Sequence, residues 1–215
     1  MYIIGLTGGS GSGKTTVSNY LRKKGFEIID FDLTTRELQK PGEPALAVIV
    51  EAFGPESLLP DGTMNRKYVG KVVFSDPKEK KKMDSIIQKY VDVLITARTD
   101  AFREAGRDVT RQTNPKDYLQ KKVIFYDHPL LFEVPYNIEP ANEAWVVDVD
   151  DETRIQRILK RDCICRDDII KRMNSQTSRQ YKLERADYVI DNSGTKEELF
   201  RNVDAQIEAL DRRLP

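Results

Sequence analysis

The sequence predicts a three-layer α/β fold with a five-stranded parallel sheet, and three observations lead to that expectation. Short apolar segments rich in β-branched residues recur five times along the 215 residues. Helix-like patterning separates these segments, and strands that alternate with helices indicate a parallel, doubly wound sheet. A glycine-rich turn follows the first segment and leads directly into a helix-like one. The expected strands are residues 2–6, 26–29, 123–126, 144–149 and 188–190.

The glycine-rich turn, Gly8-Gly-Ser-Gly-Ser-Gly-Lys14-Thr15, fits the pattern G-x-x-x-x-G-K-[ST] between a strand and a helix. In that context the pattern predicts the phosphate-binding loop of a phosphate-loop NTPase. Loop N–H groups surround the β-phosphate, Lys14 reaches the β and γ oxygens, and the Thr15 hydroxyl ligates Mg²⁺ at the helix N-terminus. A flexible Gly/Ser linker is the alternative, but it gives no reason for a Lys-Thr pair here. The candidate nucleotide-binding residues are Gly11, Ser12, Gly13, Lys14, Thr15 and Thr16.

Composition narrows the class of protein. With 39% hydrophobic and 33% charged residues, the chain can bury one substantial core, which fits one domain with an elaboration. Its 35 basic and 35 acidic residues cancel, which argues against a nucleic-acid or membrane-surface partner. No apolar stretch has the length of a membrane span, and a strand starting at residue 2 leaves no room for a secretory signal, so we expect a cytoplasmic protein. Cys163 and Cys165 indicate reduced thiols, since no zinc-like partner spacing accompanies them.

A helical insertion is expected between the second and third strands. Asp76 is a candidate N-cap before Pro77, and Glu79 completes a capping box. Apolar residues then recur with helical spacing, which predicts a long helix that ends before Gly106. The polar, aperiodic residues 107–121 predict a mobile surface loop. The expected parts of the single domain are a core (about 1–40, 122–150 and 183–215), the helical insertion (about 41–106, with helices over 43–53 and 65–74), the polar loop, a lid (about 151–182) and a C-terminal helix (196–210) that packs on the sheet.

Acidic residues follow the second and third strands. Alternation along an extended chain would put Asp30 and Asp32 on one face, where one could orient an acceptor hydroxyl and the other support Mg²⁺ or cap a helix. The alternative is that both cap a helix over 33–39. Asp127 resembles the carboxylate that holds Mg²⁺ through water in phosphate-loop enzymes. His128 is the only histidine, and we expect a structural or exposed residue, since phosphoryl transfer depends on positioning and charge stabilisation.

Residues 151–162 predict a capped helix with a basic face. Arg154, Arg157 and Arg161 lie at i, i+3 and i+7, which places them along one side. A basic strip that folds over phosphates is what a kinase lid needs, because guanidinium groups stabilise charge on the transferring phosphoryl group. The alternative is a solvated helix face balanced by neighbouring Asp and Glu residues.

Several motifs together resemble one enzyme family. They are L-T-G-G-x-G-S-G-K-T at 6–15, I-D-x-D at 29–32 with Arg36, Pro41-Gly42, Phe53-Gly54, Asp61-Gly62, Asn65-Arg66, P-L-L-F-E at 129–133, V-V-D-V at 146–149, R-I-L-K-R-D at 157–162, Arg172 with Gln176, and A-D-Y-V-I-D-N-S-G at 186–194. In this order and spacing the chain resembles the dephospho-coenzyme A kinases, which phosphorylate the 3′-hydroxyl of dephospho-CoA with ATP. The resemblance implies a nucleoside-kinase-like fold, ATP and Mg²⁺ as cofactors, dephospho-CoA as the small-molecule partner, and a monomer or weak homo-oligomer.

The resemblance also implies roles for particular residues. Asp32 would be the catalytic carboxylate facing the ribose 3′-hydroxyl, and Arg36 would help to hold the acceptor. Lys14 and Arg161 would stabilise the transferring phosphoryl group, with Arg157 in support. The remaining implied sites are Asp191 and Asn192 beside the adenine, Thr15 and Asp127 at the metal, and the helical insertion as the CoA-binding region. The chain departs from the family at Gln88-Lys89, where a His-Pro pair is usual, and loss of this proline predicts a more continuous helix.

Other functions remain open from sequence. The phosphate loop indicates only the phosphoryl donor, so a kinase that acts on another small hydroxyl acceptor is one alternative. A catalytically lapsed nucleotide-binding relative is another. A nucleotide-dependent switch is less well supported, because Asn114-Pro-Lys-Asp117 has the wrong order for a guanine-reading motif and no D-x-x-G follows an expected strand.

Overall fold

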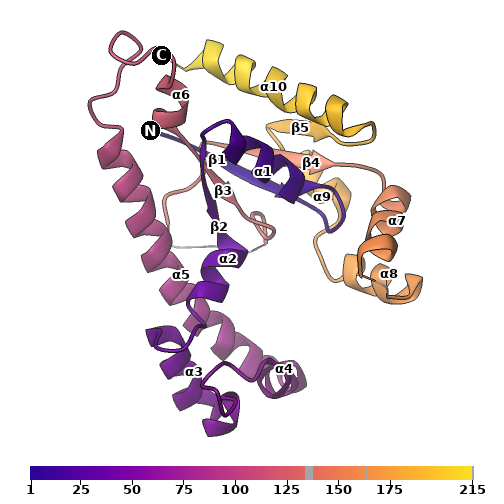
Figure 1. Cartoon of the computed structure of the whole chain (residues 1–215). Helices are drawn as coiled ribbons and strands as arrows, with labels where there is room; N and C mark the ends of the chain where they lie inside the picture. The colour runs from indigo at the N-terminus through magenta and orange to yellow at the C-terminus, as the bar shows by residue number, and fades with distance from the viewer. Residues whose placement is uncertain (134–137, 163, 215) are drawn as a thin grey trace. The chain divides into compact units, whose positions relative to one another are not determined.

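The computed structural model describes residues 1–133, 138–162 and 164–214, which fall into two compact units. We call residues 1–29, 102–133 and 140–214 the sheet unit, and residues 30–101 with 138–139 the helical unit. Figure 1 labels the elements of both. In chain order they are β1 (Tyr2–Gly8), α1 (Lys14–Lys23), β2 (Glu27–Asp30), α2 (Phe31–Glu37), α3 (Pro44–Phe53), the 3₁₀ helix η1 (Pro55–Ser57), α4 (Arg66–Ser75), α5 (Pro77–Ala105), α6 (Tyr118–Lys122), β3 (Val123–Asp127), β4 (Glu143–Asp148), α7 (Asp151–Asp162), α8 (Arg166–Asn174), α9 (Arg179–Glu184), β5 (Tyr188–Asp191) and α10 (Lys196–Arg213).

The five strands form one sheet in the order β2-β3-β1-β4-β5. β1 is parallel to both β3 and β4, and β4 is parallel to β5. Leu6 lies opposite Asp127 and Gly8 lies opposite Val147, so the carboxyl ends of these strands share one edge. The chain order reverses around β1, which makes the edge after β1 the expected place for a ligand. The α/β fold with a parallel five-stranded sheet is confirmed.

The main core of the sheet unit lies between the sheet and the helices α1 and α10. These two helices run side by side over the sheet in Figure 1. Val17 and Leu21 of α1 pack with Leu199 and Val203 of α10, and all four are buried. Four of the aromatic residues of this core meet edge to face in succession: Phe26, Phe125, Trp145 and Tyr188. Alternate strand residues such as Ile3 and Ile124 are also fully buried, as strands covered on both faces require.

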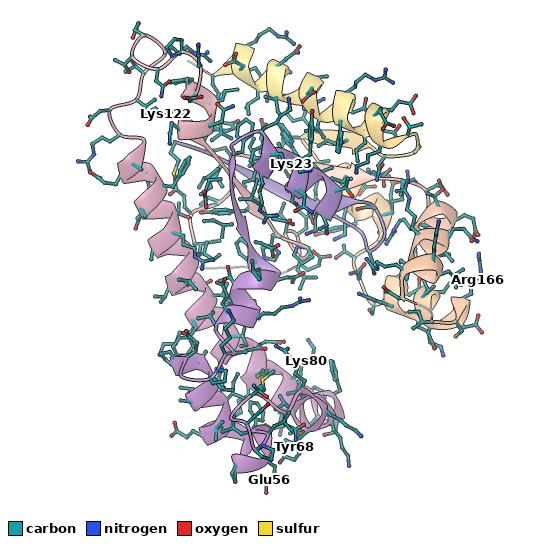
Figure 2. All side chains as sticks on the ribbon, viewed as in Figure 1. Lys23, Glu56, Tyr68, Lys80, Lys122 and Arg166 are labelled. Atoms are coloured by element: carbon teal, nitrogen blue, oxygen red, sulfur yellow. The ribbon has the colours of Figure 1, made fainter. Side chains whose placement is uncertain are left out.

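The helical unit contains α2, α3, α4 and most of α5, which confirms the expected helices. Its core joins Ile49 and Phe53 of α3 to Val69 and Val73 of α4, with Met83, Ile86 and Ile87 of α5 packed against them. Tyr68, labelled in Figure 2, donates its hydroxyl to the Phe53 carbonyl at 3.3 Å. α5 continues for 29 residues through Gln88-Lys89, which confirms the predicted continuity. Within the described residues, neither α5 nor any other helix is long and apolar enough to span a membrane.

The segment 107–121 is more ordered than its polar composition predicted. Its last residues begin α6, where Leu119 is buried in the sheet-unit core. Arg111 donates to the Asp211 carboxylate at 2.8 Å and to the carbonyls of Asp211 and Leu214, and its guanidinium lies 4.5 Å from the Tyr118 ring centroid. Residues 118–121 are therefore helical where a polar loop was predicted, and Leu119 and Arg111 attach the segment to the sheet unit. The mobility of residues 107–117 stays a prediction.

Candidate active site

The phosphate loop has the backbone geometry that its sequence predicts. It connects β1 to α1, and two of its glycines have positive φ angles, 82° at Gly11 and 98° at Gly13. A Cβ atom added at Gly11 would lie 2.8 Å from the carbonyl oxygen of Arg154, and one at Gly13 would lie 2.1 Å from Nδ2 of Asn192. Both glycines are therefore required by conformation and by space. Lys14 and Thr15 follow in the first turn of α1, which contains no acidic residue.

Lys14 is held by a buried carboxylate. Its ammonium forms an ion pair with Asp127, which ends β3 and is 2% exposed. The hydroxyl of Ser18, one turn along α1, donates to the other oxygen of Asp127. Sequence reasoning missed Ser18, although its i+4 spacing from Lys14 on a helix was a usable signal. The arrangement fixes the amine end of Lys14 beside the loop before any ligand arrives.

Three side chains from other elements form hydrogen bonds with the loop backbone. Arg154 of α7 donates from Nε to the Ser10 carbonyl at 2.9 Å, and Asn192, just after β5, donates to the Ser12 carbonyl at 2.6 Å. Gln176 accepts a hydrogen bond from the Ser10 N–H at 3.3 Å. A single sequence gives no indication that Arg154 rather than its neighbours is buried, and the role of Gln176 had no signal beyond its place in the family motif.

A pocket of about 290 Å³ opens beside the loop. Its lining residues are Gly13, Thr16, Arg157, Asn192, Gly194, Lys196 and Leu199. Nη2 of Arg157 donates to the Asn192 carbonyl at 2.9 Å, while its buried Nη1 has no hydrogen-bond partner in the described part of the chain. Asp191 is exposed, and its carboxylate accepts from the N–H and hydroxyl of Ser193 at 3.1 and 2.6 Å. The pocket therefore lies beside the phosphate loop and has two cations, Arg157 and Lys196, in its lining.

Helices α7 and α8 form a pair whose apolar sides pack through Ile155, Ile158 and Ile169. Arg166 of α8, labelled in Figure 2, pairs with Glu152 of α7. Arg161 is 58% exposed and pairs with Asp162, whose pKa is lowered mainly by that hydrogen bond. The predicted basic strip is wrong for Arg154, which is buried and turned to the loop and to Asp151. Of the two cysteines, Cys163 lies outside the described residues and Cys165 is an exposed thiol.

His128 is buried beside this edge of the sheet. Its Nδ1 accepts the Leu130 N–H at 2.9 Å, and its backbone N–H donates to the Leu6 carbonyl at 2.9 Å. Burial is the main cause that lowers the pKa of His128 to about 4, against the opposing effect of Glu133. Burial raises the pKa of Glu133, but hydrogen bonds from Lys182 and Thr177 outweigh it and hold that pKa below its ordinary value. His128 is therefore a structural residue, and the exposed alternative is wrong.

In the helical unit, Asp32 and Arg36 lie on α2. The expected extended arrangement of Asp30 and Asp32 is wrong, because the chain turns helical at Phe31. Asp30 is the N-cap, and its carboxylate accepts the Leu33 N–H at 2.9 Å. Asp32 and Arg36 are both exposed and stand one turn apart, so they lie on the same side of the helix.

Comparisons with known proteins agree with this geometry. The family model for dephospho-CoA kinase matches residues 2–198. A dephospho-CoA kinase from Shouchella clausii is 36% identical over 200 residues, 93% of this chain and 94% of that protein. One from Corynebacterium jeikeium is 39% identical over 204 residues, 95% of this chain and 97% of that protein. The crystal structure of TT1252 from Thermus thermophilus has a TM-score of 0.74 at 27% identity and covers 97% of each chain. The chain belongs to the dephospho-CoA kinase family.

Proposed function

We propose that this chain transfers the γ-phosphoryl group of ATP to the ribose 3′-hydroxyl of dephospho-CoA, giving coenzyme A and ADP. The observation that carries the proposal is a formed phosphate loop, with Lys14 held at its mouth, in a member of this family. In the reaction the acceptor oxygen bonds to the γ-phosphorus, the bond from that phosphorus to the β–γ bridging oxygen breaks, and the hydroxyl proton passes to Asp32.

The donor side uses residues of the sheet unit. The backbone N–H groups of Gly11, Gly13 and Thr15 and the ammonium of Lys14 bind the phosphates, whereas the N–H groups of Ser12 and Thr16 donate to the carbonyls of Gly9 and Gly13. Arg161, with Arg157 in support, stabilises the charge that spreads over the transferring group. The ion pair of Arg161 with Asp162 is exposed, so little free energy opposes its exchange for a phosphate.

The adenosine of ATP occupies the pocket beside the loop. The two cations in its lining, Arg157 and Lys196, support this assignment, because they suit the phosphate end of an anionic nucleotide. Asp191 and Asn192 lie at the end of β5, where they border the base. The pocket volume of about 290 Å³ suits part of a nucleotide rather than the whole molecule.

The residues beside the loop fit a magnesium ion. Mg²⁺ in such sites keeps several waters and takes one or two protein oxygens together with substrate phosphates. Thr15 offers an exposed hydroxyl, and each oxygen of Asp127 accepts one hydrogen bond, which leaves lone pairs for metal-bound water. The ion would neutralise charge on the β and γ oxygens.

The acceptor side uses the helical unit. Asp32 receives the hydroxyl proton and Arg36, one turn away, holds the anionic acceptor. The helical unit exposes large apolar side chains at Leu33, Phe74 and Val93, by 51%, 81% and 66%. Apolar surface of this kind, between charged residues, suits a pantetheine arm.

The proposal is tested by ADP release in a coupled assay with dephospho-CoA as the sole acceptor. We expect turnover that depends on both substrates and on Mg²⁺. A parallel panel of nucleosides and sugar acids addresses the alternative acceptors, and turnover with one of them but not with dephospho-CoA would overturn the assignment. ATP binding without turnover on any acceptor would instead indicate a lapsed enzyme.

We also propose a cytoplasmic monomer or weak homo-oligomer that binds neither nucleic acid nor membrane. The balanced charge supports this setting, since 35 basic and 35 acidic residues leave no excess for polyanions. Sedimentation at several concentrations measures the oligomeric state. A tight dimer at nanomolar concentration would contradict it.

A further inference from the structure

Arg154 is a buried cation with a specific position behind the phosphate loop. It is the fourth residue of α7 and only 6% exposed. Its Nε donates to the Ser10 carbonyl at 2.9 Å, and its Nη1 donates to the Asp151 carboxylate at 2.8 Å. Burying an arginine is costly unless its charge and donors are used. The buried charge of Arg154 is therefore compensated by specific hydrogen bonds to the loop and to Asp151.

The bond from Arg154 to Ser10 sets the direction of the next N–H group. In a trans peptide, C=O and the following N–H point in opposite directions. Because the Ser10 carbonyl is turned toward Arg154, the N–H of Gly11 is turned away from α7. Asn192 does the same from β5, since its bond to the Ser12 carbonyl turns the Gly13 N–H away from it. Two elements thus hold alternate carbonyls and aim alternate N–H groups, the arrangement that an anion-binding loop requires.

Close packing shows that the contact is specific. A Cβ atom added at Gly9 would lie 2.4 Å from Nη2 and 2.6 Å from Cζ of Arg154. The guanidinium therefore rests directly against the loop backbone at Gly9, where any larger residue would displace it. Asp151, its carboxylate partner, is 59% exposed, so water screens the negative charge while the positive charge stays buried.

We propose that Arg154 is a positioning residue for the phosphoryl donor: it does not touch the nucleotide, but it aims the Gly11 N–H and supplies fixed positive charge behind the loop. This inference rests on the proposed function, in which the loop binds ATP phosphates. Preorganised donors of this kind stabilise developing charge without reorganising during the reaction.

The test compares Arg154→Met and Arg154→Lys with the wild-type protein. We expect Arg154→Met to weaken ADP binding and to lower kcat/KM for ATP by about 10- to 100-fold, as loss of a charged hydrogen bond implies. The KM for dephospho-CoA should stay within about twofold, because the acceptor does not use the loop. Arg154→Lys keeps the charge but cannot donate to Ser10 and Asp151 in the same fork, so it should recover only part of the loss.

Three further measurements keep the outcome clear. Arg201→Met is the matched control, since Arg201 also pairs with a carboxylate three residues earlier, Glu198, but is 74% exposed on α10. This variant should leave kcat, both KM values and the ADP affinity unchanged. In folded Arg154→Met, the amide NMR chemical shift of Gly11 should change, and that of Gly13 should change much less. If Arg154→Met does not fold, Asp151→Asn, which loosens Arg154 without removing it, should give a loss of about threefold.

A folded Arg154→Met protein with wild-type ADP affinity and an unmoved Gly11 resonance would overturn the inference. An equal loss of kcat/KM for ATP and for dephospho-CoA would also overturn it, since that result would indicate a merely structural role. ADP binding requires no acceptor, so these measurements test Arg154 even if the wild-type chain failed to phosphorylate dephospho-CoA. Failure of the proposed function and failure of this inference are therefore distinguishable.

Discussion

The phosphate loop in the sheet unit and α2 in the helical unit present their candidate residues differently. Around the loop, Lys14, Asp127 and Arg154 are bonded to one another or to the backbone, and Asp127 is almost fully buried. On α2, Asp32 and Arg36 are exposed to solvent. The difference teaches that the proposed donor site depends on the fold, whereas the proposed acceptor site depends on two exposed side chains on one helix. Substitutions near the loop should therefore change binding and folding together, and substitutions on α2 should change turnover alone.

Asp32→Asn should have the greatest effect on turnover. Removal of a general base lowers the rate by about 10²- to 10⁴-fold, while ATP affinity and the unfolding midpoint should be preserved because Asp32 is exposed on α2. The measurements are steady-state turnover with dephospho-CoA and calorimetric ATP binding. Asp84→Asn, an exposed carboxylate paired with Lys80 in the same unit, is the control and should be silent. Unchanged turnover in Asp32→Asn would remove that residue from its role.

Lys14→Met should affect binding, turnover and stability at once. Loss of a charged donor to the phosphates lowers kcat by about 10²- to 10³-fold. The substitution also leaves the buried Asp127 carboxylate without its cation, which costs about 3–5 kcal/mol of stability. The double variant Lys14→Met, Asp127→Asn should regain part of the stability and none of the activity. Unaltered ATP affinity in Lys14→Met would contradict the loop assignment.

Features that depend on local sequence patterns could be predicted, and features that depend on tertiary packing could not. The strands, the loop and the longer helices were predictable because local patterns determine them, and Asp127 followed from its place after a strand. Burial of Arg154 was not predictable, because α7 carries three arginines at helical spacing and only the packed loop distinguishes them. The extended reading of Asp30 and Asp32 failed because the carboxylate of Asp30 caps α2 and lets the helix start one residue after the strand. Polar composition likewise concealed the anchoring of Arg111.

Acid should weaken the sheet unit through His128. Its pKa is about 4 in the folded protein and 6.5 in the unfolded chain, so the unfolded chain binds more protons between these values. The stability from the neutral imidazole is therefore complete above pH 6.5 and is lost as the pH falls, by about 1 kcal/mol at pH 5.5 and about 3 kcal/mol at pH 4. Urea unfolding at pH 7.5 and 5.5 measures this slope. His128→Asn, which can still accept the Leu130 N–H, should have a flatter slope, and an equal slope would contradict the assignment.

Substitutions at helix caps should have the smallest effects on stability, and each unit contains a cap of the same kind. Thr195 accepts the Glu198 N–H at the start of α10, and Asn65 accepts the Tyr68 N–H at the start of α4. Alanine at either position should cost about 1 kcal/mol. Asn65→Ala should also leave turnover unchanged. Trp145 is the only tryptophan and lies in the sheet-unit core, so its fluorescence reports that unit, while circular dichroism reports helices in both. We expect Thr195→Ala to lower the fluorescence midpoint in urea and Asn65→Ala to lower only the dichroism midpoint, because each cap supports its own core. Equal shifts of both probes in both variants would show instead that the two units unfold as one cooperative body.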